Sequence, residues 1–176
     1  SPHLEIFKQK NIEVLLLSDR VDEWLVANFG EYEELSFKSI AKGDLDDLDS
    51  KKEKKEKEKT AKDFEKVISK VQEVLKNRVK EVKVSSRLSE SPSCLIADEN
   101  ELGSNMERIM KSLGQDIPDT KPILEINPTH PLVEKLKKKV DKDLVKVLFD
   151  QAVLSEGGQI KEPAEFVKRM NKLMLG

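Results

Sequence analysis

Few side chains in this sequence could do covalent or acid–base chemistry. Cys94 is the only cysteine, and His3 and His130 are the only histidines. A thiol, an imidazole and a carboxylate such as Asp98 can act as nucleophile, base and orienting group when a fold brings them together. No local signature of a known hydrolase surrounds Cys94 or His130, and a lone cysteine in a strand is usually a small buried hydrophobic residue. A small Cys/His hydrolase is therefore the weakest of the functions considered.

Metal and nucleotide sites also lack their sequence patterns. Two histidines without a cysteine pair are too few for a zinc site. The acidic stretch 43–50 is not a calcium loop, because counting from Asp44 places Leu48 at the fifth position and Asp49 at the sixth, where glycine is required. Neither GxxxxGK[ST] nor GxGxxG occurs. We expect no metal ion and no cofactor within this chain.

Composition excludes several classes of partner. The 32 Lys and Arg nearly balance the 34 Asp and Glu, so the formal net charge is −2 and no positive field would attract nucleic acid. No apolar run approaches the roughly 18 residues that a membrane span needs. A single cysteine cannot form an internal disulfide, which favours a reducing, cytoplasmic setting. The chain opens on Ser1 and Pro2 without a signal-peptide pattern, and we expect it to be a segment of a longer protein.

Residues 1–76 are expected to hold a small α/β piece and a connector. The nearly continuous apolar run at 12–17 predicts a strand covered on both faces. Residues 21–29 have helical periodicity, and 35–40 return to the alternation of a strand. These elements are too few for a complete α/β domain.

Residues 43–59 form a low-complexity segment in which every residue of 51–59 is charged. Lys and Glu spaced four apart support an exposed helix, so we expect a solvated, protease-sensitive helical connector without a specific ligand. Thr60 and Asp63 then form a predicted capping box for an amphipathic helix that ends near residue 76.

Residues 77–176 mix strands and helices. Strand patterns occur at 79–85, 94–98 and 122–128, and the first two are expected to pair as neighbours. Between the second and third strands, a helical stripe ends at Gly114. The stripe consists of Leu102, Met106, Ile109, Met110 and Leu113.

The last fifty residues are predicted to form three helices, at 129–139, 141–156 and 163–175. The middle helix has two apolar stripes, so it should be covered on two sides. The last helix adds a stripe that packs either on the chain's own core or on a partner. Its members are Phe166, Val167, Met170, Leu173 and Met174.

Several long blocks, in order along the chain, resemble the C-terminal third of the heat-shock protein 90 family. They are VLLLSDRVDEW at 14–24, VSSRLSESP at 84–92, NMERIMK at 105–111, LEINPTHP at 124–131, DLVKVLFDQAVLSEG at 143–157 and EPAEFVKRMNKL at 162–173. The chain ends at Leu175 and Gly176 without the Met-Glu-Glu-Val-Asp tail of the eukaryotic cytosolic members. It therefore resembles the bacterial branch, and no tail-binding co-chaperones are expected.

The resemblance implies an α+β fold, in which a small sheet is flanked by helices. It implies that 1–76 is the C-terminal end of a middle domain, with the connector at 43–59, and that 77–176 is a dimerisation domain. The C-terminal helices would form an intermolecular four-helix bundle in a homodimer. The interface residues implied are Leu144, Leu148, Phe149, Ala152, Phe166, Met170, Leu173 and Met174.

The resemblance also implies a chaperone that contacts non-native client polypeptides. Read alone, the Met-bearing stripe is an ordinary core helix, but the family has an exposed client-binding helix at the matching position. The client-binding residues implied are Trp24, Leu102, Met106, Ile109 and Met110. ATP and magnesium would bind in an N-terminal domain absent from this chain, so the chain itself is not expected to be an enzyme. A purely structural dimerisation clamp without a client site remains the main alternative.

Overall fold

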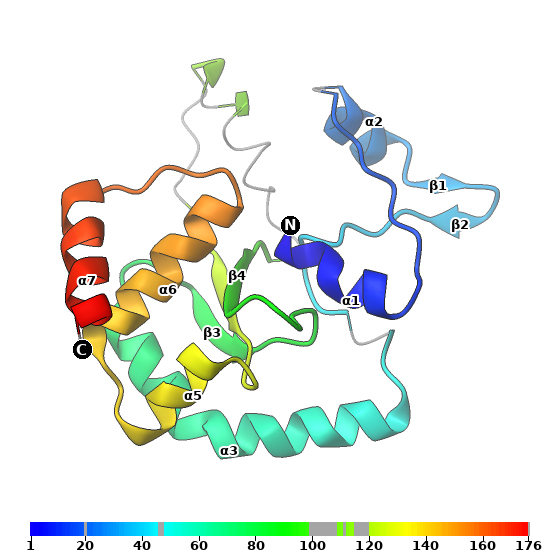
Figure 1. The fold of residues 1–176 in the computed structure, drawn as a ribbon. Coiled ribbons are helices and arrows are strands. Elements are labelled where there is room, and N and C mark those ends of the chain that lie inside the picture. The colour runs from blue at the N-terminus through cyan, green and yellow to red at the C-terminus, as the bar shows by residue number, and fades with distance from the viewer. Residues whose placement is uncertain (20, 46–47, 99–108, 111, 115–119, 176) are drawn as a thin grey trace.

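Three short strands surrounded by helices form the centre of the computed structural model (Figure 1). The structure describes residues 1–19, 21–45, 48–98, 109–110, 112–114 and 120–175. Mixed helices and small sheets agree with the α+β class expected from the sequence.

The central sheet consists of β3 (Glu81–Val84), β4 (Ser93–Ile96) and β5 (Ile123–Ile126), in the order β3-β5-β4. β5 runs parallel to β3 and antiparallel to β4. The three strands lie where the sequence predicted them, but the expected pairing of the first two is wrong, because β5 lies between them. All four residues of β5 are buried, as is usual for a strand with a neighbour on each side.

Helix α3 spans Lys51–Leu75 and begins earlier than the sequence pattern predicted. Ser50 and Glu53 form its capping box, in which the Ser50 hydroxyl accepts from the Glu53 N–H and a Glu53 carboxylate oxygen accepts from the Ser50 N–H. The capping box predicted at Thr60 is wrong, since the Thr60 hydroxyl donates to the Glu56 carbonyl in mid-helix. The charged connector therefore continues into the amphipathic helix as one element.

The C-terminal half of α3 packs into the same core as the sheet. Phe64, Val67, Val71 and Leu75 are buried in a cluster with residues of β3, β5, α5 and α6. The core thus extends across the boundary expected at residue 76. The division into two functional domains stays a prediction.

Three C-terminal helices complete the body, as predicted. They are α5 (Pro131–Lys138), α6 (Lys142–Ser155) and α7 (Pro163–Leu175). The Asp141 side chain caps α6 by accepting from two backbone N–H groups. Gly157 follows α6 with φ of 71°, a conformation that glycine adopts without a steric cost.

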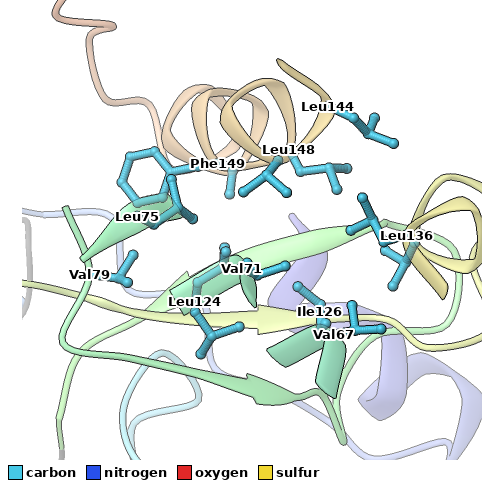
Figure 2. Packing of buried hydrophobic residues seen from close by; sticks show 14 of the residues in the cluster. Val67, Val71, Leu75, Val79, Leu124, Ile126, Leu136, Leu144, Leu148 and Phe149 are labelled. Atoms are coloured by element: carbon cyan, nitrogen blue, oxygen red, sulfur yellow. The ribbon is translucent and has the colours of Figure 1, made fainter. Parts of the chain in front are cut away.

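Helix α6 is buried on more than one side, as its two apolar stripes predicted. It contacts β4, α3 and α7, and its inward side chains lie over the sheet in Figure 2. Leu148 and Phe149 are buried there with Leu75 and Leu124. Each fully buried side chain of this size contributes about 1.5–3 kcal/mol.

The N-terminal segment contains the short helices η1 (Pro2–Leu4), α1 (Glu5–Gln9) and α2 (Asp22–Asn28). A hairpin follows, made of β1 (Glu31–Tyr32) and β2 (Leu35–Ser36). The strand predicted over 35–40 is thus reduced to its first two residues. Glu33 and Glu34 make the turn with positive φ angles, as two-residue hairpin turns commonly require.

The strand predicted at 12–17 is absent, and this prediction is wrong. Leu15 and Leu16 are 73% and 75% exposed, so the run is not covered on either face. A strand needs a neighbouring strand for its backbone hydrogen bonds. Among the described residues, none pairs with this run.

The acidic stretch before α3 is packed more closely than the sequence suggested. Leu45 is buried, and the Asp49 carboxylate is nearly buried in ion pairs with Lys10, at 3.6 Å, and with Lys57. The expectation of a fully solvated segment over 43–59 is therefore wrong for its first part. Most of 51–59 is exposed on the first turns of α3.

The Glu5 carboxylate of α1 accepts several hydrogen bonds from the loop between β3 and β4. The backbone N–H groups of Ser89, Glu90 and Ser91 donate to Glu5 at 2.7, 2.8 and 3.1 Å. The Ser91 hydroxyl also donates to Glu5, at 2.5 Å. Burial raises the pKa of Glu5, but the hydrogen bonds from Ser91 and from the three backbone groups outweigh it, so the pKa is lowered from 4.5.

We expect Glu5→Gln to flatten the acid side of the protein's stability profile. Because the folded-state pKa of Glu5 lies below the unfolded value, ionised Glu5 stabilises the fold fully above about pH 4.5. That contribution is lost as pH falls through the lower folded-state pKa. Urea midpoints at pH 7 and at successive pH values below 5 measure the difference. Glu13→Gln, at an exposed position, is the control, and equal pH slopes for both variants would contradict the prediction.

Candidate interaction surfaces and the buried polar cluster

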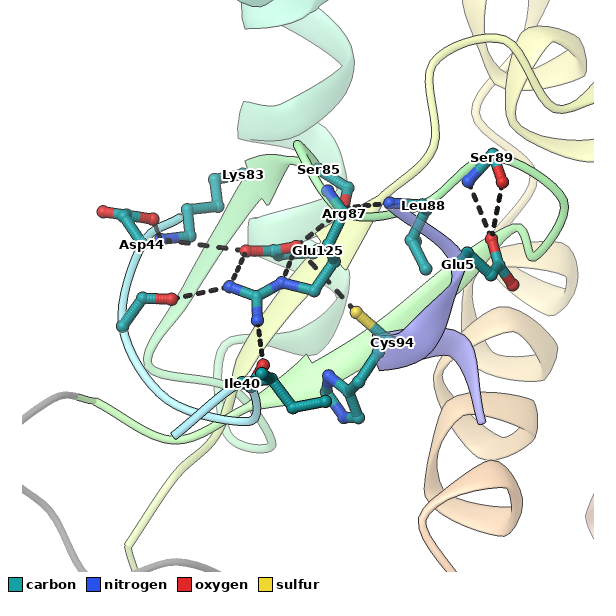
Figure 3. Close-up of polar contacts among 12 residues, drawn as sticks. Glu5, Ile40, Asp44, Lys83, Ser85, Arg87, Leu88, Ser89, Cys94 and Glu125 are labelled. Atoms are coloured by element: carbon teal, nitrogen blue, oxygen red, sulfur yellow. Dashed lines mark hydrogen bonds and ion pairs between the residues drawn. The ribbon is translucent and has the colours of Figure 1, made fainter. Parts of the chain in front are cut away.

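Arg87 and Glu125 form an ion pair in which both side chains are almost completely buried (Figure 3). Arg87 is fully buried, and its Nε and Nη2 donate to the two Glu125 oxygens at 2.9 and 3.2 Å. The Ser85 hydroxyl donates to the same carboxylate at 2.7 Å. Both charges are therefore satisfied by paired hydrogen bonds.

The same guanidinium also holds the segment that leads into the body. It donates to the Ile40 carbonyl and, at 2.6 Å, to the Gly43 carbonyl. Arg87 thus ties residues 40–43 to the centre of the sheet. With every partner an internal one, the cluster is suited to holding structure rather than to binding a ligand.

Sequence reasoning missed this cluster, although one signal was present. Glu125 interrupts the apolar run of β5, and a charge inside a strand expected to be buried requires a partner. Nothing local identifies Arg87 as that partner.

Cys94, His130 and Asp98 are not brought together as a hydrolase would require. Cys94 is fully buried, and its thiol lies 3.9 Å from a Glu125 oxygen. Burial first, and the Glu125 charge second, raise the pKa of the Cys94 thiol far above its ordinary value. His130 accepts from the Leu132 N–H as the cap of α5, and Asp98 accepts from Lys80 at 2.7 Å. This arrangement does not produce a thiolate nucleophile.

The described residues also offer no grouped metal ligands. Within the described part of the chain, no cluster of three His, Cys, Asp or Glu side chains could hold a metal ion. In the same part, no helix is both long and apolar enough to cross a membrane.

Three of the five residues implied to contact clients lie in the described part of the chain. Trp24 is 68% exposed on α2, beside the exposed Leu25. Ile109 and Met110 are half-buried in a helical turn, with the exposed Leu113 after them. Leu102 and Met106 lie outside the described residues.

The residues implied at the dimer interface fall into two groups. Four of them, on α6, are buried in the chain's own core: Leu144, Leu148, Phe149 and Ala152. Those on α7 are more accessible, because Phe166, Met170 and Leu173 are half-buried and Met174 is exposed. The structure thus identifies the α6 group as core residues of the single chain, and the dimer role of all eight stays a prediction.

Three more exposed apolar side chains, of which only Val167 belongs to the stripe predicted for the last helix, adjoin the α7 group. Val167 and Leu175 are exposed on α7, and Leu154 is exposed near the end of α6. No residue of α7 is buried, although the helix is amphipathic. An apolar helix face left at the surface commonly marks an interaction site.

Comparison with known proteins gives a consistent result. The family model described as "Hsp90 protein" matches residues 1–176. The chain is 76% identical over 174 residues to the chaperone protein HtpG of Vesicomyosocius okutanii subsp. Calyptogena okutanii, and 55% identical over 179 residues to that of Nitrosomonas europaea. It is 47% identical over 181 residues to the HtpG of Colwellia psychrerythraea. Each match covers 99% of this chain and 28% of the relative's length.

Proposed function

Since the chain belongs to the Hsp90 family of chaperones, we propose that it pairs two subunits of a molecular chaperone and contacts non-native client polypeptides. The observation that carries the proposal is the exposed apolar face of α7, continued by α6 at Leu154. On the same premise, ATP and magnesium bind in segments outside these 176 residues, and the protein acts in the cytoplasm.

The proposed homodimer rests on what α7 leaves uncovered. Met174 and Leu175 are 74% and 89% exposed, and Val167 lies on the same helix. Burying a large apolar side chain contributes about 1.5–3 kcal/mol. In a homodimer each seam residue is present in both subunits, so its contribution counts twice. Association costs about 4–15 kcal/mol, so a seam of four or more such side chains per subunit favours a stable pair. Packing α6 and α7 of both subunits together gives a four-helix bundle.

The proposed client contact rests on the exposed aromatic and aliphatic side chains of the N-terminal segment. Trp24 and Leu25 lie on α2, and Val21 precedes them at an exposed position. Flexible methionine side chains, such as Met110, adapt to apolar segments of different shapes. A structural clamp without a client site is the alternative, and it predicts no loss of chaperone activity when Trp24 is changed.

We expect the variant Phe166→Glu with Met170→Glu to be monomeric. Both positions are half-buried on α7, and carboxylates there would be stranded in an apolar seam. Light scattering at micromolar concentration should give the mass of a dimer for the unchanged chain and of a monomer for the variant. Lys168→Gln, at a position exposed on the same helix, should leave the dimer intact. A monomeric unchanged chain would refute the dimer.

Trp24→Ala is expected to weaken suppression of a client's aggregation without changing melting temperature or dimer mass. The side chain is mostly exposed, so its removal takes little from the fold. Met106→Ser with Met110→Ser is expected to act in the same way. Tyr32→Ala, which removes another exposed aromatic ring from the same segment, is the matched control. Unchanged suppression in both Trp24→Ala and the double variant would favour the structural clamp.

A further inference from the structure

A charged cleft of about 150 Å³ lies where α6 and α7 meet the residues that precede β3. The two helices run beside each other in Figure 1. Four cationic side chains and two carboxylates line the cleft: Arg78, Lys146, Lys161, Arg169, Asp150 and Glu162. Cations thus exceed carboxylates around a space that is large enough for a small ion.

The carboxylate at the base of the cleft is already neutralised. Asp150 is buried, and it accepts a hydrogen bond from Arg78 Nη2 at 2.6 Å. The Arg78 guanidinium is held in place by the Phe149 ring, whose centroid lies 4.2 Å away. This pair occupies only part of the hydrogen-bonding capacity of the guanidinium.

Arg169, on α7, forms only long ion pairs with carboxylates of the described residues. Its side chain is 12% exposed, and its nearest carboxylates, those of Glu165, Asp150 and Asp143, lie at 3.8, 3.9 and 4.0 Å. These distances are too long for hydrogen bonds. Within the described part of the chain, no residue provides an acceptor for its N–H donors. Its nitrogen atoms reach solvent at the cleft, so an anion there can replace water as their acceptor.

Two lysines add charge at the same place. Lys146 is half-buried on α6, and Lys161 is exposed just before α7. Among the described residues, neither has a hydrogen bond or an ion-pair partner within 4.0 Å. Their ammonium groups can therefore turn toward an anion in the cleft without giving up a partner.

We propose that this cleft binds a phosphate-class oxyanion, held by the two guanidinium groups and the two lysines. Guanidinium forks match the oxygen spacing of phosphate, and charge-assisted hydrogen bonds of this kind are among the strongest in proteins. The cleft is smaller than the roughly 300–1,000 Å³ of sites for organic ligands, so it takes the ion or a terminal phosphoryl group and leaves the rest of a larger molecule outside. The bound anion would bridge α7, α6 and the residues before β3.

The test is a titration of the whole 176-residue chain with inorganic phosphate, followed by calorimetry at constant ionic strength. We expect saturable binding at one site per chain, weakened roughly tenfold or more by Arg169→Gln, because a hydrogen bond to a charged group is lost. Lys168→Gln removes a lysine from the exposed side of α7 and should leave the affinity unchanged. Chloride at matched ionic strength should not compete.

Two further arms make the result decisive. Glycerol phosphate that binds as well as inorganic phosphate assigns the site to a terminal phosphoryl group, and its failure to bind assigns the site to the free ion. If Arg169→Gln does not fold, Lys146→Gln with Lys161→Gln replaces it, since neither side chain has a hydrogen bond or an ion pair with a described residue to lose. Absence of saturable binding, equal competition by chloride, or equal weakening by Lys168→Gln overturns the proposal.

Discussion

Replacing Arg87 with methionine is expected to lower the free energy of unfolding by about 3–5 kcal/mol, which is the usual cost of breaking a buried ion pair. The substitution keeps much of the side-chain volume but leaves the buried Glu125 carboxylate without its main partner. It also leaves the Ile40 and Gly43 carbonyls without their donor. Urea unfolding measures the loss as a shift of the midpoint.

Two comparisons separate the ion pair from the loss of packing. Arg87→Met with Glu125→Met removes both charges and should recover part of the loss, but not all of it, because the two backbone carbonyls remain unsatisfied. Lys66→Met, at an exposed position of α3, should change stability by less than about 0.5 kcal/mol. A double variant that is no more stable than the single one would show that the carbonyl contacts dominate.

Leu148→Ala is the second change with a large expected effect, a loss of about 2–5 kcal/mol. Leu148 is 2% exposed, and it packs with Leu124 and Ile126 of the sheet within a single chain. Leu154→Ala makes the same substitution near the end of α6, where the side chain is 48% exposed. That control should cost less than about 0.5 kcal/mol when measured on the monomer.

The dependence on protein concentration distinguishes the two roles of Leu148. Truncating a core residue of the single chain lowers the stability of monomer and dimer alike. Truncating a residue of the dimer seam lowers stability only where dimers form, so the effect of the substitution grows with protein concentration. We expect the loss for Leu148→Ala to be nearly independent of protein concentration in the unchanged chain, and to persist in the variant Phe166→Glu with Met170→Glu. If Leu148→Ala caused no loss of stability in that variant, Leu148 would act in the dimer interface and not in the core of one chain.

Local pattern predicted most of the elements of the sheet body. The helices α5, α6 and α7 follow from apolar spacing and end signals, which are properties of adjacent residues. The order of the strands did not follow, because β3 and β4 each pair with a strand that lies far along the chain. The strand predicted at 12–17 failed for a related reason. An apolar run specifies a strand only when a neighbouring strand accepts its hydrogen bonds.

The candidate sites were less predictable than the fold. Arg87 and Glu125 are 38 residues apart, and only the folded chain brings them together. On α6, the spacing of apolar residues is the same whether the chain's own sheet or a second subunit buries them, so the sequence pattern alone does not distinguish the two. The resemblance implies that Leu148 and Phe149 contact a partner, and in the single chain they are buried with residues of the sheet and α3. Trp24 is exposed, so it has no role in the core of this chain, and its contact with clients stays a prediction.

The length of helix α3 also fixes the direction in which its first turn faces, relative to its last turns in the core. Its 25 residues span about 37 Å at 1.5 Å per residue. Its last turns are fixed in the core, and in its first turn Glu53 accepts from Lys10, beyond the end of α1, at 3.0 Å. One inserted residue would rotate that first turn by about 100° and point Glu53 away from Lys10, whereas seven inserted residues would nearly restore its direction and only lengthen the strut. The charged stretch at 51–59 is thus restricted in length, and at Glu53 and Lys57 it is restricted in composition as well, because these side chains contact Lys10 and Asp49.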